Sequence, residues 1–157
     1  PKLDQKIFNR YGLTLNQVTK LCKRLISDAQ QKGSAEHYSL SQGHTIDQLR
    51  SECKRSLNPS SKTCIIANYY MGSPQNKGIG LPFEMGHFSP IGAYDETTDS
   101  ILIMDVWWQS ADAYWVSVED LWQAMCTGPN EQWGEGKEQR ARKTRGFIVV
   151  STNNQGS

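Results

Sequence analysis

Apolar residues recur along this chain at spacings of three and four, which is the period of an α-helix packed on one side. These stretches predict helices over residues 14–31, 45–57 and 117–125. Each stretch opens with a Thr or Ser followed three residues later by Gln or Asp, a spacing at which side chains satisfy the first free backbone N–H groups of a helix. The pattern therefore predicts the first residue of each helix more precisely than its last residue.

Short runs rich in aromatic and β-branched residues predict strands between the helices. The predicted strands cover residues 36–41, 62–71, 87–94, 100–108 and 147–150. Turn-forming residues separate the third run from the fourth, so these two form a β-hairpin. The fourth run has apolar residues on both faces, which is typical of a strand covered on both sides. Helices followed by such a hairpin predict an α+β fold, with an antiparallel sheet packed by helices.

One His and one Asp stand inside the hairpin. Asp105 lies where an unpaired carboxylate would be costly to desolvate, so it needs a partner. With the turn centred near Thr97, antiparallel pairing puts Asp105 almost opposite Ser89 and diagonal to His87, within side-chain reach. A carboxylate that fixes one imidazole nitrogen leaves the other available as a general base. A buried structural His–Asp pair fits the spacing equally well.

Several stretches of the sequence, in order, resemble the phytochelatin synthase family, which are papain-like cysteine transpeptidases acting on glutathione. The strongest are GHFSPIGAY and the following ILIMDV, in which His87 and Asp105 stand eighteen positions apart. The others are GLTLNQVTKL, IIANYY, YWVSVEDLWQAM and TRGFIVVS. The resemblance implies that this chain is the later half of a papain-like cysteine protease fold. It also implies that His87 is the general base and that Asp105 orients it.

The resemblance further implies a nucleophilic Cys in a segment upstream of the block at residues 12–21. Because residues 2–11 contain no Cys, we expect the nucleophile to come from a separate N-terminal chain or from a part outside this sequence, unless it has been lost. Arg145 begins the family's RGF segment and is a candidate for binding a substrate carboxylate. Trp108 and Tyr94 are further candidates for contacting the substrate.

The four cysteines of this chain are far apart in the sequence and show no CxxC spacing. They therefore do not suggest a zinc site or any other metal site. The favoured interpretation is that all four are buried free thiols rather than disulfides. Cys64 is the one candidate for a substitute nucleophile, although a strand thiol without a cationic neighbour keeps a high pKa.

The 157 residues are 37% hydrophobic, which allows one domain, or part of one, spanning residues 1–157. The formal net charge is +1, so no global field points to nucleic acid or to a membrane as partner. Oligomeric state is left open. The sequence favours the cytoplasm only slightly over a periplasmic or secreted location reached through a signal peptide that was later removed.

The function implied by the resemblance is cleavage of the Cys-Gly bond of glutathione through a γ-glutamylcysteinyl acyl-enzyme, with or without formation of phytochelatins. Trp108, Ser110 and Met71 stand where plant members usually have basic residues, which argues for hydrolysis over chain extension. The partner is glutathione or another γ-glutamyl peptide. No cofactor is needed for the chemistry, and a heavy-metal ion such as Cd or Zn is expected only as a metal–thiolate activator. The alternative is an inactive fragment or a thiol- or peptide-binding module without the nucleophile.

Overall fold

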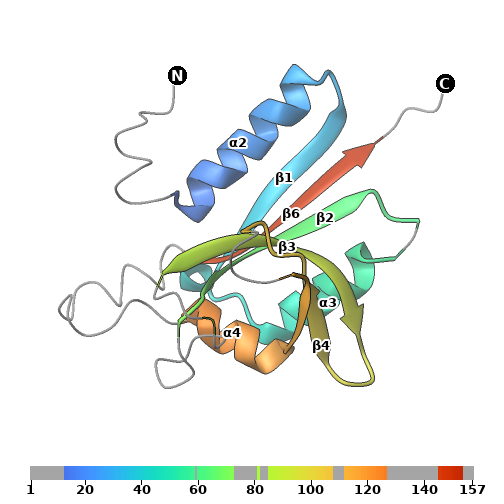
Figure 1. Ribbon diagram of the computed structural model, residues 1–157. Helices are drawn as coiled ribbons and strands as arrows, with labels where there is room; N and C mark the ends of the chain where they lie inside the picture. Colours follow the sequence, from blue (N-terminus) through green and yellow to red (C-terminus); the bar gives the residue numbers. More distant parts are fainter. Residues whose placement is uncertain are drawn as a thin grey trace.

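A computed structural model shows a mixed α/β fold built on one antiparallel sheet (Figure 1). The described residues are 13–58, 60–72, 81, 85–107, 112–126 and 145–153. Within them, the helices are α2 (Leu15–Asp28), η1 (Leu40–Gln42), α3 (Ile46–Ser56) and α4 (Val118–Cys126). The strands are β1 (Lys32–Ser39), β2 (Thr63–Tyr70), β3 (Gly86–Asp95), β4 (Ser100–Ile103), β5 (Tyr114–Ser117) and β6 (Gly146–Asn153). Their order in the sheet is β1-β6-β2-β3-β4-β5.

The three predicted helix starts are confirmed. The side chains of Thr14 and Thr45 each accept a hydrogen bond from the backbone N–H three residues on. The Gln side chain at that position in turn accepts one from the backbone N–H of the Thr. Ser117 accepts the Asp120 N–H in the same way, at 3.0 Å. The end of α2 comes earlier than predicted, because Gln30 adopts a left-handed backbone conformation (φ 53°). The chain can then turn directly into β1.

Two of the strand predictions need correction, and one further strand was not predicted. The strand predicted over residues 36–41 begins at Lys32, because all eight residues of β1 pair with β6. The strand predicted over residues 100–108 ends at Ile103. The strand β5 was not predicted. Its four residues lie directly before α4, and so short a pattern cannot be distinguished from a loop that leads into the helix.

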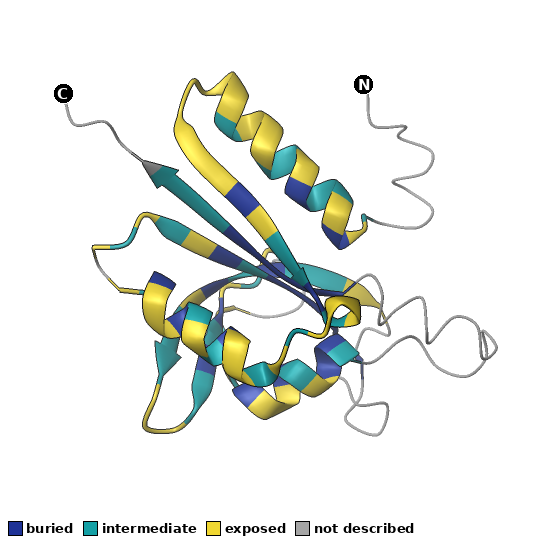
Figure 2. Cartoon of the chain, turned by 180° about the vertical axis from the view of Figure 1, so that it is seen from behind, coloured by how far each residue is buried: buried dark blue, intermediate teal, exposed yellow. Residues whose placement is uncertain are grey.

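The two faces of the sheet are covered by different helices (Figures 1 and 2). Helices α3 and α4 pack on the face that holds Ile65, Tyr69, Ile103 and Phe147, and these side chains form the main core. Helix α2 covers the opposite face over β1 and β6. On that side of the hairpin Met104 is 46% exposed, so the prediction of a fourth run covered on both faces is wrong.

A β-bulge in β3 sets the register of the hairpin. Tyr94 pairs with Ile101, but beyond the bulge Ile91 pairs with Ile103. Without this one-residue shift, Ile103 would face Gly92, whose side of the strand points away from the core. A Cβ on Gly92 would lie 2.7 Å from the Met104 Cγ, so glycine lets the bulge close. The bend in β3 is visible in Figure 1, and the shift keeps His87 on the same face as the residues of β4 that enter the core.

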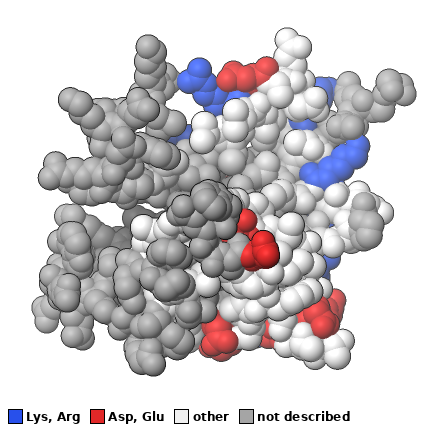
Figure 3. All heavy atoms as spheres, in the orientation of Figure 1, with Lys and Arg blue, Asp and Glu red and all other residues white. Residues whose placement is uncertain are grey.

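Charged side chains are mixed on the described part of the face shown in Figure 3, where acidic and basic groups are interspersed. This agrees with the near balance of 17 Lys and Arg against 16 Asp and Glu in the sequence. Within the described residues, no helix is both long and apolar enough to cross a lipid bilayer.

Candidate functional site

His87 and Asp105 meet at the edge of the core. His87 is the second residue of β3 and pairs across the sheet with Tyr69 of β2. Asp105 lies two residues beyond the end of β4. The His87 Nε2 is 2.9 Å from the Asp105 Oδ1. The His87 side chain is 12% exposed and that of Asp105 is fully buried, so the predicted pairing of the two residues is present and shielded from water.

The carboxylate of Asp105 is held by more than the imidazole. The backbone N–H of Trp107 donates to the same oxygen, Oδ1, at 2.7 Å. The Tyr114 hydroxyl donates to the other oxygen, Oδ2, at 3.5 Å. A buried carboxylate is stable only when its oxygens accept such bonds, and here both oxygens do.

The imidazole of His87 is fixed by two aromatic rings as well as by Asp105. The Tyr69 ring meets it edge-to-face, with ring centroids 5.8 Å apart and an interplanar angle of 82°. The Trp107 ring lies 6.4 Å away in a tilted arrangement. Because an ionised carboxylate can only accept, Nε2 carries the proton of the neutral ring and Nδ1 keeps its lone pair. Within the described residues, Nδ1 makes no hydrogen bond.

Two tyrosine hydroxyls stand behind this pair and were not singled out by the sequence analysis. The hydroxyl oxygens of Tyr69 and Tyr114 are 2.8 Å apart. Burial raises the pKa of Tyr69 to about 12. The pKa of Tyr114 is raised still further, by burial first and by the bond to Tyr69 second. Both phenols therefore stay protonated at physiological pH and can act as donors.

Arg145 lies close to the His87 segment but is itself buried, with 6% of its surface exposed. Its Nη1 donates to the carbonyl oxygen of Ala124 in the last turn of α4 at 3.3 Å, and its guanidinium carbon lies 5.3 Å from the centre of the Tyr70 ring. A Cβ on Gly86 would be 3.3 Å from Nη2. Burial lowers the pKa of Arg145 to about 10, which leaves it cationic at neutral pH.

Of the other two predicted substrate contacts, only Tyr94 lies within the described residues, and it is not at the His87–Asp105 pair. Tyr94 lies seven residues further along β3, at the turn, where its hydroxyl donates to Asp99 Oδ1 at 2.9 Å. That carboxylate is also bound by Arg50. Trp108 lies outside the described residues, as does Ser110.

None of the four cysteines forms a disulfide, as predicted, and all four lie within the described residues, but they are not all buried. Cys53 is in the core, where burial raises its pKa to about 12. Cys64 is exposed, which corrects its assignment to a buried position. It also occupies the face of β2 opposite to Tyr69, because alternate residues of a strand point to opposite sides. Cys64 is therefore not placed to work with His87, which contacts Asp105, Tyr69 and Trp107 in the described part of the chain.

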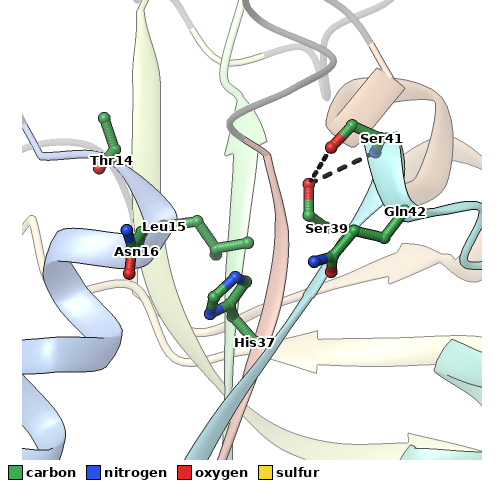
Figure 4. Close-up of a pocket in the computed structure, with 7 residues that line it drawn as sticks. All are labelled: Thr14, Leu15, Asn16, His37, Ser39, Ser41 and Gln42. Carbon is green, nitrogen blue, oxygen red and sulfur yellow. Dashed lines mark hydrogen bonds between the residues drawn. The ribbon is translucent and has the colours of Figure 1, made fainter.

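No group of three or more His, Cys, Asp or Glu side chains within the described residues is arranged to hold a metal ion. A cavity of about 220 Å³ is open between the start of α2, the end of β1 and η1. Figure 4 shows His37 rising from β1 beside Leu15, with the Ser39–Ser41 hydroxyl pair on the other side. This cavity is not lined by His87 or Asp105, so it is separate from the candidate site.

The sequence profile described as phytochelatin synthase matches residues 2–147. The chain belongs to the phytochelatin synthase family. Similar proteins include "Glutathione gamma-glutamylcysteinyltransferase 1" of Arabidopsis thaliana, 34% identical over 84 residues, which are 54% of this chain and 16% of that protein. The protein of the same name from Triticum aestivum is 35% identical over 107 residues, 68% of this chain and 18% of the relative. "Glutathione gamma-glutamylcysteinyltransferase 3" of Lotus japonicus is 48% identical over 66 residues, 42% of this chain and 12% of the relative.

The matched regions span less than a fifth of these curated relatives. The similarity therefore covers only a small part of each of these relatives. The names of these relatives are names of enzymes, and they describe transfer of a γ-glutamylcysteinyl group with glutathione.

Proposed function

We propose that this chain carries the acid–base half of a glutathione-directed cysteine acyltransferase or hydrolase. The observation that carries the proposal is the His87 Nε2–Asp105 Oδ1 bond of 2.9 Å in a buried setting, which leaves Nδ1 facing away from the carboxylate. The six-stranded antiparallel sheet with helices on both faces is compatible with the later half of a papain-like fold. Residues 1–157 form one domain or part of one in this proposal.

The proposed reaction begins with a cysteine thiol supplied by the part of the family's catalytic domain that precedes the block at residues 12–21. His87 Nδ1 removes the thiol proton, and the thiolate sulfur attacks the carbonyl carbon of the Cys-Gly peptide bond of glutathione. The C–N bond then breaks, and the proton on Nδ1 passes to the departing glycine amine. A γ-glutamylcysteinyl thioester remains on the protein.

The thioester is resolved by a second use of the same imidazole. His87 Nδ1 takes a proton from water, or from the amine of a second γ-glutamyl peptide, as that group attacks the thioester carbonyl. The C–S bond breaks and the proton returns to the sulfur. Throughout, Asp105 holds the Nε2 proton in place and stabilises the imidazolium.

Hydrolysis is favoured over peptide-chain extension. Met71 stands where plant members usually carry a basic residue, and its side chain is fully buried in the core. A buried Met offers no charge to an anionic second peptide, whereas an exposed Arg would bind its carboxylates. We therefore expect water to be the main acceptor, and the ratio of free γ-glutamylcysteine to extended peptide measures this directly.

Arg145 is the proposed partner for a carboxylate of glutathione. Its Nη2 lies beside Gly86, the residue that precedes His87, and its charge is retained at neutral pH because its lowered pKa is still about 10. A buried guanidinium is already desolvated, which strengthens its attraction for an anion. Arg145→Met is expected to raise the KM for glutathione, and a circular-dichroism spectrum checks that the buried substitution keeps the fold.

Metal ions enter this proposal only with the substrate. A Cd or Zn ion bound to the glutathione thiol would arrive as part of a metal–thiolate complex, and no step of the acyl transfer is assigned to it. Comparing glycine release from free and metal-bound glutathione under otherwise identical conditions tests whether the complex is the preferred substrate.

The test of the function is glycine release from glutathione by the longest natural polypeptide that contains these 157 residues. His87→Ala should reduce the rate by on the order of 10² or more, because general acid–base catalysis contributes at least that much. His44→Ala is the matched control, since within the described part of the chain His44 bonds only to the nearby Gln48 and packs on Tyr38. Equal rates for the wild type and His87→Ala would contradict the proposal, and glutathione binding without any glycine release would favour a thiol-binding module.

A further inference from the structure

We propose that Tyr69 and Tyr114 form a positioning device that fixes the orientation of the His87–Asp105 pair. The inference deepens the proposed function and rests on it for its catalytic meaning. The arrangement of the four side chains is a property of the resting protein, so it can be tested without any turnover. Neither tyrosine touches the reacting atoms in this account; both act through Asp105 and through the imidazole ring.

The four side chains form a closed circuit of contacts. His87 bonds to Asp105 Oδ1 at 2.9 Å, and Asp105 Oδ2 accepts from the Tyr114 hydroxyl at 3.5 Å. The Tyr114 oxygen lies 2.8 Å from that of Tyr69. The circuit closes where the Tyr69 ring meets the imidazole edge-to-face. Each member is therefore held from two sides.

The direction of the hydrogen bonds in this circuit follows from the donor and acceptor inventory. An ionised carboxylate has no proton to give, so Tyr114 must donate to Asp105. Either oxygen can donate in the 2.8 Å bond between the two hydroxyls, and Tyr69 is the donor when the Tyr114 proton is directed to Asp105. Both phenols keep their protons, because burial is the first cause that raises the pKa of each.

The backbone holds the two tyrosines in place more firmly than side-chain contacts alone would. Tyr69 is fully buried and pairs with His87 across β2 and β3. Tyr114 pairs with Ile103 across β5 and β4. The circuit thus joins strands β2, β3 and β5 through Asp105, which lies two residues beyond the end of β4.

The physical role of the circuit is to limit two rotations. Asp105 Oδ1 already accepts from Trp107 and His87, but a carboxylate held by one oxygen can still turn about its Cβ–Cγ bond. The bond from Tyr114 to Oδ2 opposes that turn, although its 3.5 Å length is beyond the range of a strong O–H···O bond. The edge of the Tyr69 ring opposes rotation of the imidazole. Together they keep the Nε2 proton aimed at Asp105 and Nδ1 aimed at the substrate side.

The alternative is that the two tyrosines are only buried core residues whose hydroxyls happen to pair. A structural role alone would change stability when a hydroxyl is removed, but it would leave the imidazole of the folded protein unchanged. The deciding observable is therefore the proton on His87 Nε2. It can be followed by NMR in ¹⁵N-labelled protein, and the assignment is simple because the chain has three histidines and His87→Ala removes the signal.

The test compares Tyr114→Phe and Tyr69→Phe with Tyr94→Phe. Tyr94→Phe is the matched control, because it removes a tyrosine–carboxylate bond at the other end of the same hairpin. We expect exchange of the Nε2 proton with water to be about two- to tenfold faster in Tyr114→Phe and Tyr69→Phe, the change that loss of one hydrogen bond produces. Tyr94→Phe should match the wild type. Unchanged exchange and unchanged imidazole ¹⁵N shifts in folded Tyr114→Phe would overturn the inference.

Two further points keep this test decisive. If Tyr69→Phe fails to fold, Tyr114→Phe decides alone, because Tyr114 lies on the last strand of the sheet and is only partly buried. In a polypeptide that releases glycine, Tyr114→Phe should lower kcat by about the same factor with KM unchanged, the split expected for a lost positioning interaction. Absence of glycine release in the wild type would refute the proposed function and leave the NMR result standing as evidence on the circuit.

Discussion

The two ends of the β3–β4 hairpin are built from similar parts and do different work. At the turn, Asp99 accepts from the Tyr94 hydroxyl and from the Arg50 guanidinium, with Nη2 2.7 Å from Oδ2. At the other end, Asp105 accepts from the Tyr114 hydroxyl and from the imidazole of His87. Each end thus combines one carboxylate, one tyrosine and one basic side chain.

The differences lie in burial and in the basic group. The Asp99 side chain is 40% exposed, whereas that of Asp105 is fully buried. Arg50 stays charged at any ordinary pH, so its pair with Asp99 can anchor the turn to α3 but cannot exchange a proton. An imidazole exchanges protons near neutral pH. The comparison shows that the turn end fixes the hairpin in place and the His87 end is the one suited to chemistry.

The largest expected effect in this comparison is that of Asp105→Ala on turnover. Removing the carboxylate releases the His87 ring and the stabilisation of its cation, so we expect glycine release to fall by roughly 10² to 10⁴. Asp105→Asn keeps one acceptor oxygen and should lose less. Steady-state rates on folded protein measure both, and a rate for Asp105→Ala within a factor of two of the wild type would make the pair purely structural.

Asp99→Asn should affect stability and leave turnover unchanged. It removes the charge that Arg50 binds with three hydrogen bonds, but the pair is partly exposed and therefore screened by water. We expect the Tm to fall by about 2 to 4 °C, with kcat per folded molecule equal to the wild type. A loss of turnover at unchanged stability would show that the turn takes part in the reaction.

The stability difference between the wild type and Asp99→Asn should depend on pH. Arg50 holds the pKa of Asp99 below its usual range. The unfolded carboxyl has a pKa of about 3.9, so the folded state binds its proton only at lower pH, and the contribution is fully present above that value. It is lost as pH falls through the folded pKa. Thermal unfolding from pH 6 to about pH 2 should show the two Tm values converging, and a constant gap would contradict this assignment.

The smallest expected effect is that of Tyr94→Phe. It removes one hydrogen bond to Asp99, which retains Arg50, so we expect a Tm change of about 2 °C or less and no change in KM for glutathione. Calorimetry and steady-state kinetics measure these. A raised KM would instead support Tyr94 as a substrate contact, the role predicted from the sequence.

The helices and the His–Asp pair could be predicted from the sequence because their signals are local. The capping residues Thr14 and Thr45 lie within one turn of the helices that they start, and hairpin pairing alone brings Asp105 toward His87. The roles of Tyr69 and Tyr114 could not be predicted from the sequence, because a tyrosine in a strand looks the same whether its hydroxyl faces water or a buried carboxylate.

The remaining errors come from tertiary structure that no local pattern encodes. The strand β5 has four residues and forms because β4 offers a free edge. The exposure of Met104 reflects which part of the outer face α2 covers. In each case a distant element decides the outcome.

The most direct test of the central claim is the mass of the intact polypeptide after brief exposure to glutathione. The account predicts a covalent increase of one γ-glutamylcysteinyl unit, accompanied by free glycine, and neither should appear in His87→Ala. The Asp105→Ala variant, which lacks the carboxylate that binds His87, should be acylated more slowly than the wild type. Full acylation of His87→Ala at the wild-type rate would contradict the claim that this imidazole is the acid–base group of the site.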